Sequence, residues 1–445
     1  MNIYFAFEGQ ARELNARIHF CIEAAKRGHT AYFGQKINLY PLMSKVEKGI
    51  FFHKSVQLRK LELIKKFKNL GHFNAAIDEE GLMRISDEVY FGYRLSKKCL
   101  NLLDIFFSWG EDHTKSIINY YPDLVGKVHS AGNSRIDILK SMSKNDYRVE
   151  KLKKKYGNFL LFASKFPRVN GLNYGKSYAD SMKLNLKTMS KSVYEELIKN
   201  QEWEMDNMHG YMDAIKECAK QFSNKKIIVR PHPVEDLNTW YKFADKIKLD
   251  NVIIETDGNS IIPWILAAEK IISHNCTTAV ESAFLGVKTI NYTPFPNKEF
   301  EYELPIICSD NARNIDELKN LITKNEIFDF DEKQVEYYVQ NSGKKSFCDF
   351  SMETIENIID SSNFSKKNKI MNNFTLIFAK IFKSIKINYS LFFGSGRKRR
   401  TYFTQKFQGF NINYVRKIIK SFSAQNDVDV VEAWPGVYLI TKKSA

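Results

Sequence analysis

The stretch Lys225–Pro296 decides the fold class of this chain. It contains KKIIVRPHPVEDL (225–237), NVIIE (251–255) and AEKIISHNCTTAVESAFLGVKTINYTPFP (268–296). Short β-branched runs alternate with polar loops and a helical segment, a pattern typical of a parallel α/β sheet. In such sheets ligands bind at the carboxyl ends of the strands, beside helix N-termini whose free N–H groups favour anions. An Arg, a His and two Thr residues follow these strands, so the stretch predicts a phosphate or pyrophosphate site.

The first part of the chain repeats the strand–helix–strand pattern. A strand at 3–7, a helix at 13–27 that ends at Gly28, and a strand at 31–34 form one parallel unit. The pattern predicts further strands at 74–77, 105–108, 127–130 and 159–163, a charged helix and linker at 140–157, a long helical region at 176–222, and helices from 310 to 360. We expect an α/β fold of two Rossmann-like domains facing each other across a cleft, with residues 1–145 in the first domain, 146–360 in the second and 361–445 as an appendage.

Positive charge is concentrated in that appendage. The formal net charge is +16, and residues 361–420 contain 14 Lys or Arg and no acid, which leaves about +2 (16 − 14) for the rest. Apolar residues recur at helical spacing from Phe374 to Ile385, and Arg397–Arg400 is a basic cluster. This predicts an amphipathic helix that binds an anionic membrane surface through 371–420. Packing of the apolar stripe on the body is the open alternative, and nucleic acid is disfavoured because no binding motif accompanies the charge. Residues 428–441 predict a strand pair that turns near Pro435.

Cofactor, metal and membrane-spanning signals are missing from the sequence. The six Cys have no paired spacing, and the nine His form no HExxH pattern, so we expect no metal, no disulfide and no cofactor. The start MNIYFAFEGQ has no basic segment before a long apolar run, and no stretch approaches the roughly 20 apolar residues of a spanning helix. The expected location is the cytoplasm, at the inner face of the cytoplasmic membrane.

Three consecutive acids follow the predicted strand at 74–77. Asp78, Glu79 and Glu80 precede Gly81. Crowded carboxylates repel one another, so we expect at least one raised pKa and a general base among them. A solvated turn with a helix-capping acid is the alternative.

The RPHP loop carries the second candidate group. Its prolines, Pro233 among them, fix the backbone around His232. An imidazole held beside Arg230 is suited to stabilise a departing phosphate. The alternative is a loop histidine that binds nothing.

The loop HNCTT opens the next predicted helix. Thr277 and Thr278 are candidates for phosphate binding, together with Asn275 and with His274 as ligand or supporting residue. Thr278 and Glu281 also match a capping box, so they are alternatively no more than the start of the helix.

Together these motifs resemble a known family. The matching segments are Arg12-Glu13-Leu14, DEEG (78–81), SWG (108–110), GNSR.D (132–137), RPHP (230–233) and SHNCTTAVE (273–281). They resemble the bacterial surface carbohydrate biosynthesis proteins, which are similar to capsule Kdo transferases and bacterial polysialyltransferases. The resemblance covers about residues 1–345. It implies a GT-B fold and a CMP-activated acidic sugar donor, without an essential metal.

The resemblance also implies roles for individual residues. Glu79 corresponds to the base and His232 to the group on the donor phosphate, while Thr277 and Thr278 correspond to a hydroxyl pair on the donor. Asp78 extends the acidic motif by one residue, so the choice among the three acids stays open. The other motifs supply candidates for an acceptor site or cleft, namely Arg12, Glu13, Trp109, Asn133 and Arg135.

The sequence as a whole predicts a metal-independent glycosyltransferase of surface polysaccharide synthesis. Its partners would be a nucleotide-sugar donor and a glycan or lipid-linked acceptor. A CDP-polyol phosphotransferase of the teichoic-acid type is the nearest alternative. A non-hydrolysing sugar-nucleotide epimerase and a non-catalytic glycan-binding scaffold are further alternatives.

Overall fold

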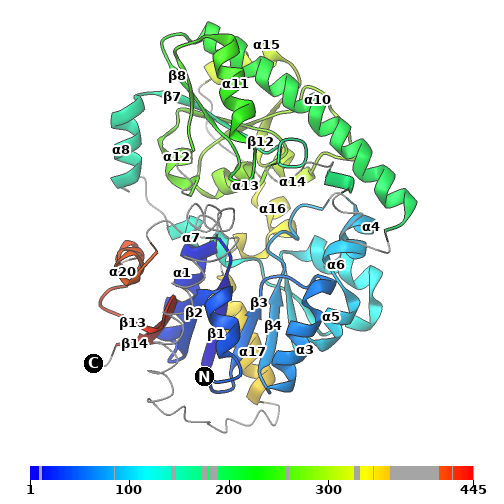
Figure 1. The fold of residues 1–445 in the computed structure, drawn as a ribbon, viewed down its shortest axis with the longest axis vertical. Coiled ribbons are helices and arrows are strands. Elements are labelled where there is room, and N and C mark those ends of the chain that lie inside the picture. The colour runs from blue at the N-terminus through cyan, green and yellow to red at the C-terminus, as the bar shows by residue number, and fades with distance from the viewer. Residues whose placement is uncertain are drawn as a thin grey trace, which may run out of the picture. The chain divides into compact units, whose positions relative to one another are not determined.

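Two sheets organise the chain, one in each of two units of this computed structural model (Figure 1). The sheet of unit 1 is parallel except for two antiparallel strands at one edge, and the sheet of unit 2 is parallel. The structure describes residues 1–9, 13–84, 86–141, 147–171, 178–180, 189–256, 260–324, 331–343, 345–360, 410–422 and 424–443. Unit 1 comprises Met1–Leu82, Arg94–Ser141 and Glu336–Ala445, and unit 2 comprises Met83–Tyr93 and Met142–Val335. The predicted α/β class of two Rossmann-like units is confirmed.

The sheet of unit 1 has the strand order β13-β14-β2-β1-β3-β4-β5-β6. Its strands are β1 (Asn2–Phe7), β2 (Thr30–Gln35), β3 (Ile50–His53), β4 (Phe73–Ile77), β5 (Ile105–Ser108), β6 (Val128–Ser130), β13 (Val428–Trp434) and β14 (Val437–Lys442). All neighbours from β2 to β6 are parallel. The strands are nearly continuous apolar runs because helices cover both faces of such a sheet.

Aromatic side chains fill the core on one face of this sheet. Phe5 stacks on Phe52 of the neighbouring strand with ring centroids 4.8 Å apart, and Phe20 of helix α1 (Asn15–Lys26) packs edge-on against both. The other helices of the unit are α2 (Lys36–Leu39), α3 (Leu61–Asn69), α5 (Lys97–Leu102), α6 (Glu111–Tyr120), α7 (Ser134–Ser141), α17 (Phe347–Asp360) and α20 (Ile412–Ser421).

The end of the chain is part of unit 1. The predicted strand pair is confirmed as β13 and β14, and β14 adds to β2 in antiparallel register, with Leu439 opposite Tyr32. In α20 the apolar residues Val415, Ile418 and Ile419 are buried in the core. The expected appendage therefore contributes two strands and a helix to unit 1, because their apolar sides complete its core (Figure 1).

Two further findings bear on the sequence predictions. Residues 336–360, expected in the second domain, belong to unit 1, where Phe347 and Met352 of α17 are buried in the core. Of the segment 371–420, only 410–420 is described, and there the apolar face packs on unit 1. Phe374–Ile385 and Arg397–Arg400 lie outside the described residues.

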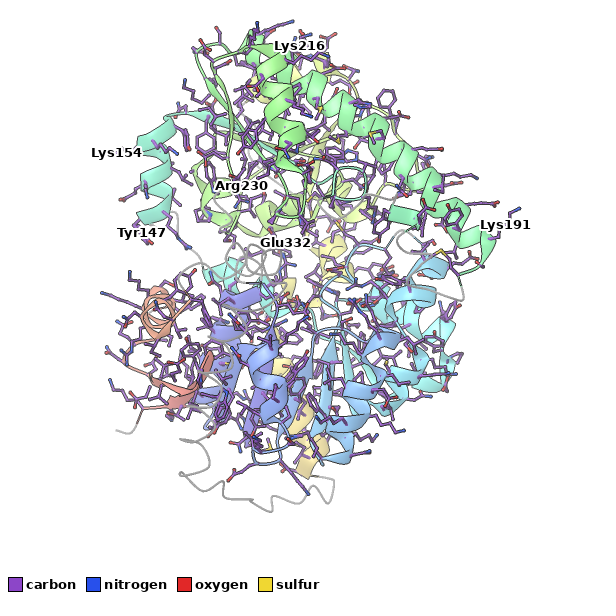
Figure 2. All side chains as sticks on the ribbon, viewed as in Figure 1. Tyr147, Lys154, Lys191, Lys216, Arg230 and Glu332 are labelled. Atoms are coloured by element: carbon purple, nitrogen blue, oxygen red, sulfur yellow. The ribbon has the colours of Figure 1, made fainter. Side chains whose placement is uncertain are left out.

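The sheet of unit 2 has the order β12-β11-β10-β7-β8-β9 and is parallel throughout. Its strands are β7 (Phe159–Ala163), β8 (Lys226–Arg230), β9 (Val252–Ile254), β10 (Lys270–Ser273), β11 (Thr289–Tyr292) and β12 (Ser309–Ala312). The helices are α4 (Asp87–Val89), α8 (Tyr147–Tyr156), α10 (Lys191–Gln221), α11 (Leu237–Ile247), α12 (Ile262–Ala267), α13 (Thr277–Phe284), α14 (Glu303–Ile307) and α15 (Ile315–Thr323), and α16 (Glu332–Tyr338) spans the boundary between the units. The charged helix expected at 140–157 is α8, which carries Tyr147 and Lys154 (Figure 2).

The direction in which successive strands are added reverses at the middle of each sheet, although the strands there are parallel. In unit 1, β1 has β2 on one side and β3 on the other; in unit 2, β7 has β8 on one side and β10 on the other. Loops that leave adjacent strands in opposite directions open a crevice at the carboxyl ends of these strands. Each unit thus has a natural ligand position after its first strand.

The described residues contain no helix that is both long enough and apolar enough to cross a membrane. Within the same residues, no three His, Cys, Asp or Glu side chains are grouped as metal ligands would be. All six cysteines are buried and free.

Candidate functional site

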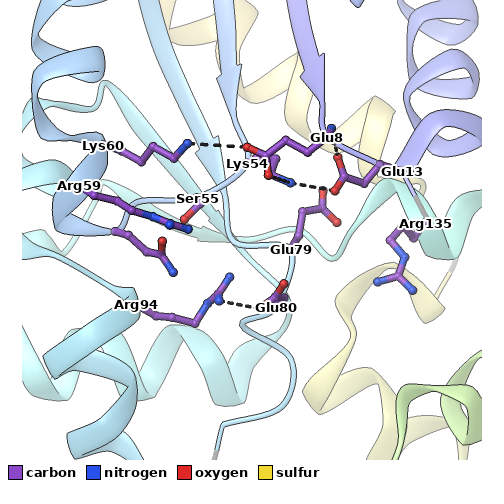
Figure 3. A pocket seen from close by; sticks show the side chains of 11 residues that line it. Glu8, Glu13, Lys54, Ser55, Arg59, Lys60, Glu79, Glu80, Arg94 and Arg135 are labelled. Atoms are coloured by element: carbon purple, nitrogen blue, oxygen red, sulfur yellow. Dashed lines mark hydrogen bonds and ion pairs between the residues drawn. The ribbon is translucent and has the colours of Figure 1, made fainter. Parts of the chain in front are cut away.

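A cavity of about 100 Å³ lies at the carboxyl edge of the unit 1 sheet (Figure 3). Side chains from the loops after β1, β3 and β4 line it, and Arg135 of α7 adds to them. Most lining residues are charged: the acids are Glu8, Glu13, Glu79 and Glu80, and the cations are Lys54, Arg59, Lys60, Arg94 and Arg135. The cavity is therefore suited to a polar or charged ligand.

Glu79 is the buried acid of this cavity. Its carboxylate forms an ion pair with Arg17 of α1, a side chain with no exposed surface, and Asn133 donates to its other oxygen at 3.5 Å. Burial alone would raise the pKa of the Glu79 carboxyl, but the charges of Arg17 and Arg135 outweigh it, so the pKa lies below its usual value. Glu79 is therefore a carboxylate at neutral pH.

The other two acids of DEEG share one arginine. Arg94 donates to both Asp78 oxygens at 3.2 and 3.0 Å and to Glu80 at 2.5 Å. Asp78 is 1% exposed and does not line the cavity, whereas Glu80 does. The expectation that crowding raises the pKa of an acid here is wrong for Glu79, because an arginine lies within reach of each carboxylate and compensates the repulsion.

Glu13 belongs to a charged network at the end of β1. It accepts from the Glu8 amide at 2.9 Å and from Lys54 Nζ at 2.8 Å, and Lys54 also pairs with Glu8 at 2.9 Å. Burial would raise the pKa of Glu8, but Lys54 and Lys36 lower it to about 2. These contacts fix the loop after β3 to the loop after β1. Arg12 lies outside the described residues.

The GNSR.D motif connects Glu79 to the C-terminal part of unit 1. Gly132 has a φ of +86°, and a Cβ there would collide with Asn341. Asn341 accepts from the Asn133 amide at 3.0 Å, donates to the Asn133 carbonyl at 2.8 Å, and donates to Asp137 at 2.7 Å. Asp137 in turn accepts from the Phe347 amide at the start of α17. The motif places Asn133 against Glu79 and Arg135 beside the cavity.

Trp109 supports the backbone of the turn that carries the three acids. Its indole N–H donates to the Asp78 carbonyl at 2.7 Å, and the side chain is 3% exposed. It fixes the backbone of the DEEG turn and does not line the cavity.

In unit 2 the RPHP loop is held by a carboxylate that the motif does not include. Glu235, fully buried, accepts from the His232 amide at 3.2 Å, from Ser164 Oγ at 2.8 and 2.9 Å, and from Trp240 Nε1 at 2.9 Å. Burial raises the pKa of Glu235, while hydrogen bonds from Phe166, Ser164, Trp240 and His232 oppose the rise. Glu235 therefore joins the loops after β7 and β8, the two adjacent strands at the middle of the sheet.

The side chains of the RPHP loop differ in burial. Arg230 is 8% exposed with its guanidinium 5.8 Å from the Trp264 ring centroid, His232 is half-buried, and Pro233 is exposed. The backbone around His232 is thus fixed, as the prolines predict, while part of the imidazole remains accessible. Arg230 lies at the carboxyl end of β8 (Figure 2).

His274 and Asn275 lie inside unit 2. His274 stacks on Phe166 and donates from Nδ1 to the Tyr292 carbonyl at 3.1 Å; burial, helped by the charge of Lys165, lowers its pKa to about 4. Asn275, with a φ of 44°, accepts from the Tyr302 amide and donates to the Phe300 carbonyl. Both side chains contact neighbouring loops of unit 2, and the ligand role expected for them from the sequence stays a prediction.

The helix after β10 begins earlier than the capping box predicts. Cys276 is the N-cap of α13, and its Sγ accepts from the Thr278 amide at 3.5 Å. Thr277 and Thr278 are the first two helical residues, so Thr278 and Glu281 do not form a capping box. Thr277 is half-buried and Thr278 is 5% exposed.

The structure brings Glu79, Glu80, Glu13 and Arg135 together in unit 1, and sets Arg230, His232, Thr277 and Thr278 at the carboxyl ends of β8 and β10 in unit 2. Sequence reasoning missed Arg17, Lys54, Arg94 and Glu235. A buried helix position occupied by Arg in NARIHF (15–20), and the Glu next to RPHP, were the available signals.

Comparisons with known proteins find solved structures of similar fold. No family model matches the chain, and no curated protein matches it. A UDP-GlcNAc 2-epimerase from Methanocaldococcus jannaschii is similar with a TM-score of 0.51 and 12% identity, over 81% of this chain and 100% of that one. S. aureus MnaA, solved with UDP, has a TM-score of 0.50 and 12% identity, over 83% and 98%. The likeness is one of fold, and it confirms the GT-B-like class. Neither structure is named as a Kdo transferase or a polysialyltransferase, so that finer resemblance stays a prediction.

Proposed function

We propose that this protein is an enzyme that acts on a nucleotide-activated sugar in the synthesis of a bacterial surface carbohydrate. The observation that carries the proposal is Glu79, a buried carboxylate kept ionised by Arg17 in a polar cavity at the carboxyl edge of a parallel sheet. A buried ionised group in a cavity is a common mark of a catalytic centre. The likeness in fold to two proteins named for, or solved with, UDP compounds supports the nucleotide.

Epimerisation of a UDP-sugar is the finer reaction that the fold comparisons favour. One of the two similar structures is named as a UDP-GlcNAc 2-epimerase. Where such inversion proceeds by proton transfer, a base removes the proton from one face of the carbon and an acid returns a proton to the other face. An enzyme of this kind needs an ionised group to accept the first proton. Glu79 is the candidate, with Glu80 as a second acid in the same cavity.

Glycosyl transfer is the second candidate, and the paired motifs favour it. Glu79 in DEEG would take the proton of an acceptor hydroxyl. Arg230, His232, Thr277 and Thr278 in unit 2 would bind the nucleotide phosphate, since cations and hydroxyls at strand ends and a helix N-terminus stabilise anions. The donor would be a CMP-activated acidic sugar and the acceptor a glycan or a lipid-linked glycan.

One incubation series separates these reactions. The purified chain is given UDP-GlcNAc, a CMP-activated acidic sugar or CDP-glycerol, with and without a glycan acceptor. Proton NMR of the sugar detects epimerisation, release of CMP with a glycan product indicates transfer, and CMP release with CDP-glycerol indicates polyol phosphate transfer. Turnover by Glu79→Gln at the wild-type rate would show that Glu79 is not the catalytic base. If no donor is turned over and Glu79→Gln binds glycan as the wild type does, the result favours the alternative of a non-catalytic glycan-binding scaffold.

We also propose a peripheral membrane location through the basic segment 361–409. The apolar face of α20 is buried in unit 1, so membrane binding would depend on residues before it. Flotation of the chain with vesicles of anionic or neutral lipid, compared with a chain that lacks 361–409, tests this. Equal binding to both vesicle types would contradict the electrostatic part.

A further inference from the structure

The loop after β3 lines the unit 1 cavity, although no motif includes it. It reads KSVQLRK from Lys54 to Lys60, and five of its side chains are among those that line the cavity. Figure 3 shows Ser55, Arg59 and Lys60 on the side of the cavity opposite Arg135, with Glu79 between them. The loop thus forms one wall of the cavity that contains the proposed catalytic acid.

Two polar atoms on this wall are buried and have no partner in the described chain. They are Ser55 Oγ, in a residue 8% exposed, and Gln57 Oε1, in a residue 4% exposed. Buried polar atoms in folded proteins are nearly always hydrogen-bonded to protein, water or ligand. The cavity of about 100 Å³ is several times the roughly 10–15 Å³ that one water needs. Because both residues line the cavity, these two atoms are candidates to bind something that enters it.

The charges of the cavity are compensated unequally. Lys54 pairs with Glu8 and Glu13, and Arg94 pairs with Asp78 and Glu80. Arg59, by contrast, is exposed and forms no ion pair within the described residues, and Lys60 forms only a long ion pair, of 3.8 Å, with Glu8. The part of the wall formed by Arg59 and Lys60 carries excess positive charge.

The pKa of Lys60 agrees with an excess of positive charge on this part of the wall. Burial lowers the pKa of Lys60 despite the nearby Glu8, and the cations Lys36, Arg59 and Lys54 lower it further. An anion bound beside Arg59 and Lys60 would offset this repulsion.

We propose that the 54–60 loop is a binding subsite for an anionic saccharide. Sugar hydroxyls donate to Gln57 Oε1 and exchange hydrogen bonds with Ser55 Oγ, while the carboxylate or phosphate of the sugar binds Arg59 and Lys60. The cavity combines hydroxyl partners with two cations, Arg59, which has no ion pair within the described residues, and Lys60, whose ion pair with Glu8 is long at 3.8 Å. This combination fits an acidic sugar better than a neutral one. The inference rests on the proposed function only in that it takes the ligand to be a saccharide.

Binding without turnover tests the subsite. Saturation-transfer NMR titrations of the full chain use methyl glucuronide, glucose 6-phosphate, methyl glucoside and inorganic phosphate as probes. We expect one or both acidic sugars to bind at least about tenfold more tightly than methyl glucoside and than inorganic phosphate. Preference between the two acidic sugars shows whether the anion is a carboxylate or a phosphate.

Variants locate the binding. Arg59→Ala and Gln57→Leu should each weaken binding of the preferred acidic sugar about tenfold, while the unfolding temperature shows that the fold is kept. Lys65→Ala, which removes an exposed cation of α3, is the matched control and should bind as the wild type does. Unchanged affinity in both loop variants, equal affinity for charged and neutral sugars, or no binding of any sugar would overturn the proposal. Because no donor is present, these results do not depend on whether the enzyme epimerises or transfers.

Discussion

Arg17 and Glu79 form an ion pair inside unit 1, between the helix that follows β1 and the loop that follows β4. Arg17 has no exposed surface and its guanidinium lies 4.0 Å from the Phe5 ring centroid, so the charge has no access to water. The catalytic candidate and the core of the unit are therefore linked: the carboxylate that lines the cavity also neutralises a buried cation.

Replacement of Glu79 should affect both stability and activity. Glu79→Gln leaves the Arg17 charge buried without a carboxylate, which we expect to lower the free energy of unfolding by about 3–5 kcal/mol and to abolish turnover. The double variant Arg17→Met with Glu79→Gln should regain most of the stability, because it removes the unpaired charge, but no activity. Urea unfolding and the donor assays measure the two effects. Turnover by the stable double variant would show that Glu79 is structural only.

Acid should weaken unit 1 through Glu8. Lys54 and Lys36 outweigh burial and lower the pKa of Glu8 from 4.5 to about 2. A carboxylate with a lowered pKa stabilises the fold above its unfolded-state pKa, and this contribution is lost as pH falls from about 4.5 to about 2. Glu8→Gln should therefore be less stable than the wild type at pH 7, and the difference should disappear near pH 2.

The control for this pH dependence is Glu62→Gln on the exposed side of α3. Its unfolding free energy should follow the wild type across the same range. A difference between Glu8→Gln and the wild type that persists unchanged from pH 7 to pH 2 would contradict the role of Glu8 ionisation.

Apolar patterns predicted most strands, but they did not predict β3. Its four residues, IFFH, are buried on both faces and show no alternation, so the run cannot be told from a helical segment by periodicity. Because β3 was missed, the loop at 54–60 was missed too, together with Lys54. β12, with the sequence SDNA, has no strand pattern and is held by backbone pairing with β11.

Motifs predicted which loops carry polar groups, but not which atoms these groups contact. DEEG indicated an acid site correctly placed at the end of β4. Its charge state was not predictable, because Arg17 and Arg94 are 62 and 16 residues from their partners and their approach depends on the fold. The capping box at Thr278 failed for a local reason, since Cys276 fills the N-cap position two residues earlier.

Gly132→Ala should lower the free energy of unfolding more than Gly126→Ala, which is a matched comparison. Both have a positive φ, +86° and +82°, but a Cβ at Gly132 meets Asn341 whereas a Cβ at Gly126 meets nothing within 4 Å. Gly126→Ala should cost about 1–2 kcal/mol for the left-handed backbone alone. Gly132→Ala should cost about 2 kcal/mol more, because it also displaces the two hydrogen bonds between Asn133 and Asn341. Equal unfolding free energies for the two variants would show that the Asn133–Asn341 contact contributes nothing.

Glu235 should position the RPHP loop for nucleotide binding. Gln keeps one acceptor oxygen and has an N–H₂ group in place of the other. Donors would then face one another either at Trp240 Nε1 or at the amides of Phe166 and His232, so the loop would lose one of its fixed contacts. We expect Glu235→Gln to lose about 1–3 kcal/mol of stability and, at a temperature where it remains folded, to bind UDP or CMP at least about tenfold more weakly. Isothermal titration measures the affinity, and Glu202→Gln on the exposed side of α10 is the control. His232→Ala should also weaken binding of this nucleotide. Combining His232→Ala with Glu235→Gln should cause little further loss of affinity, since both changes remove the same contact. Full additivity of the two losses would mean that Glu235 stabilises unit 2 without acting through His232.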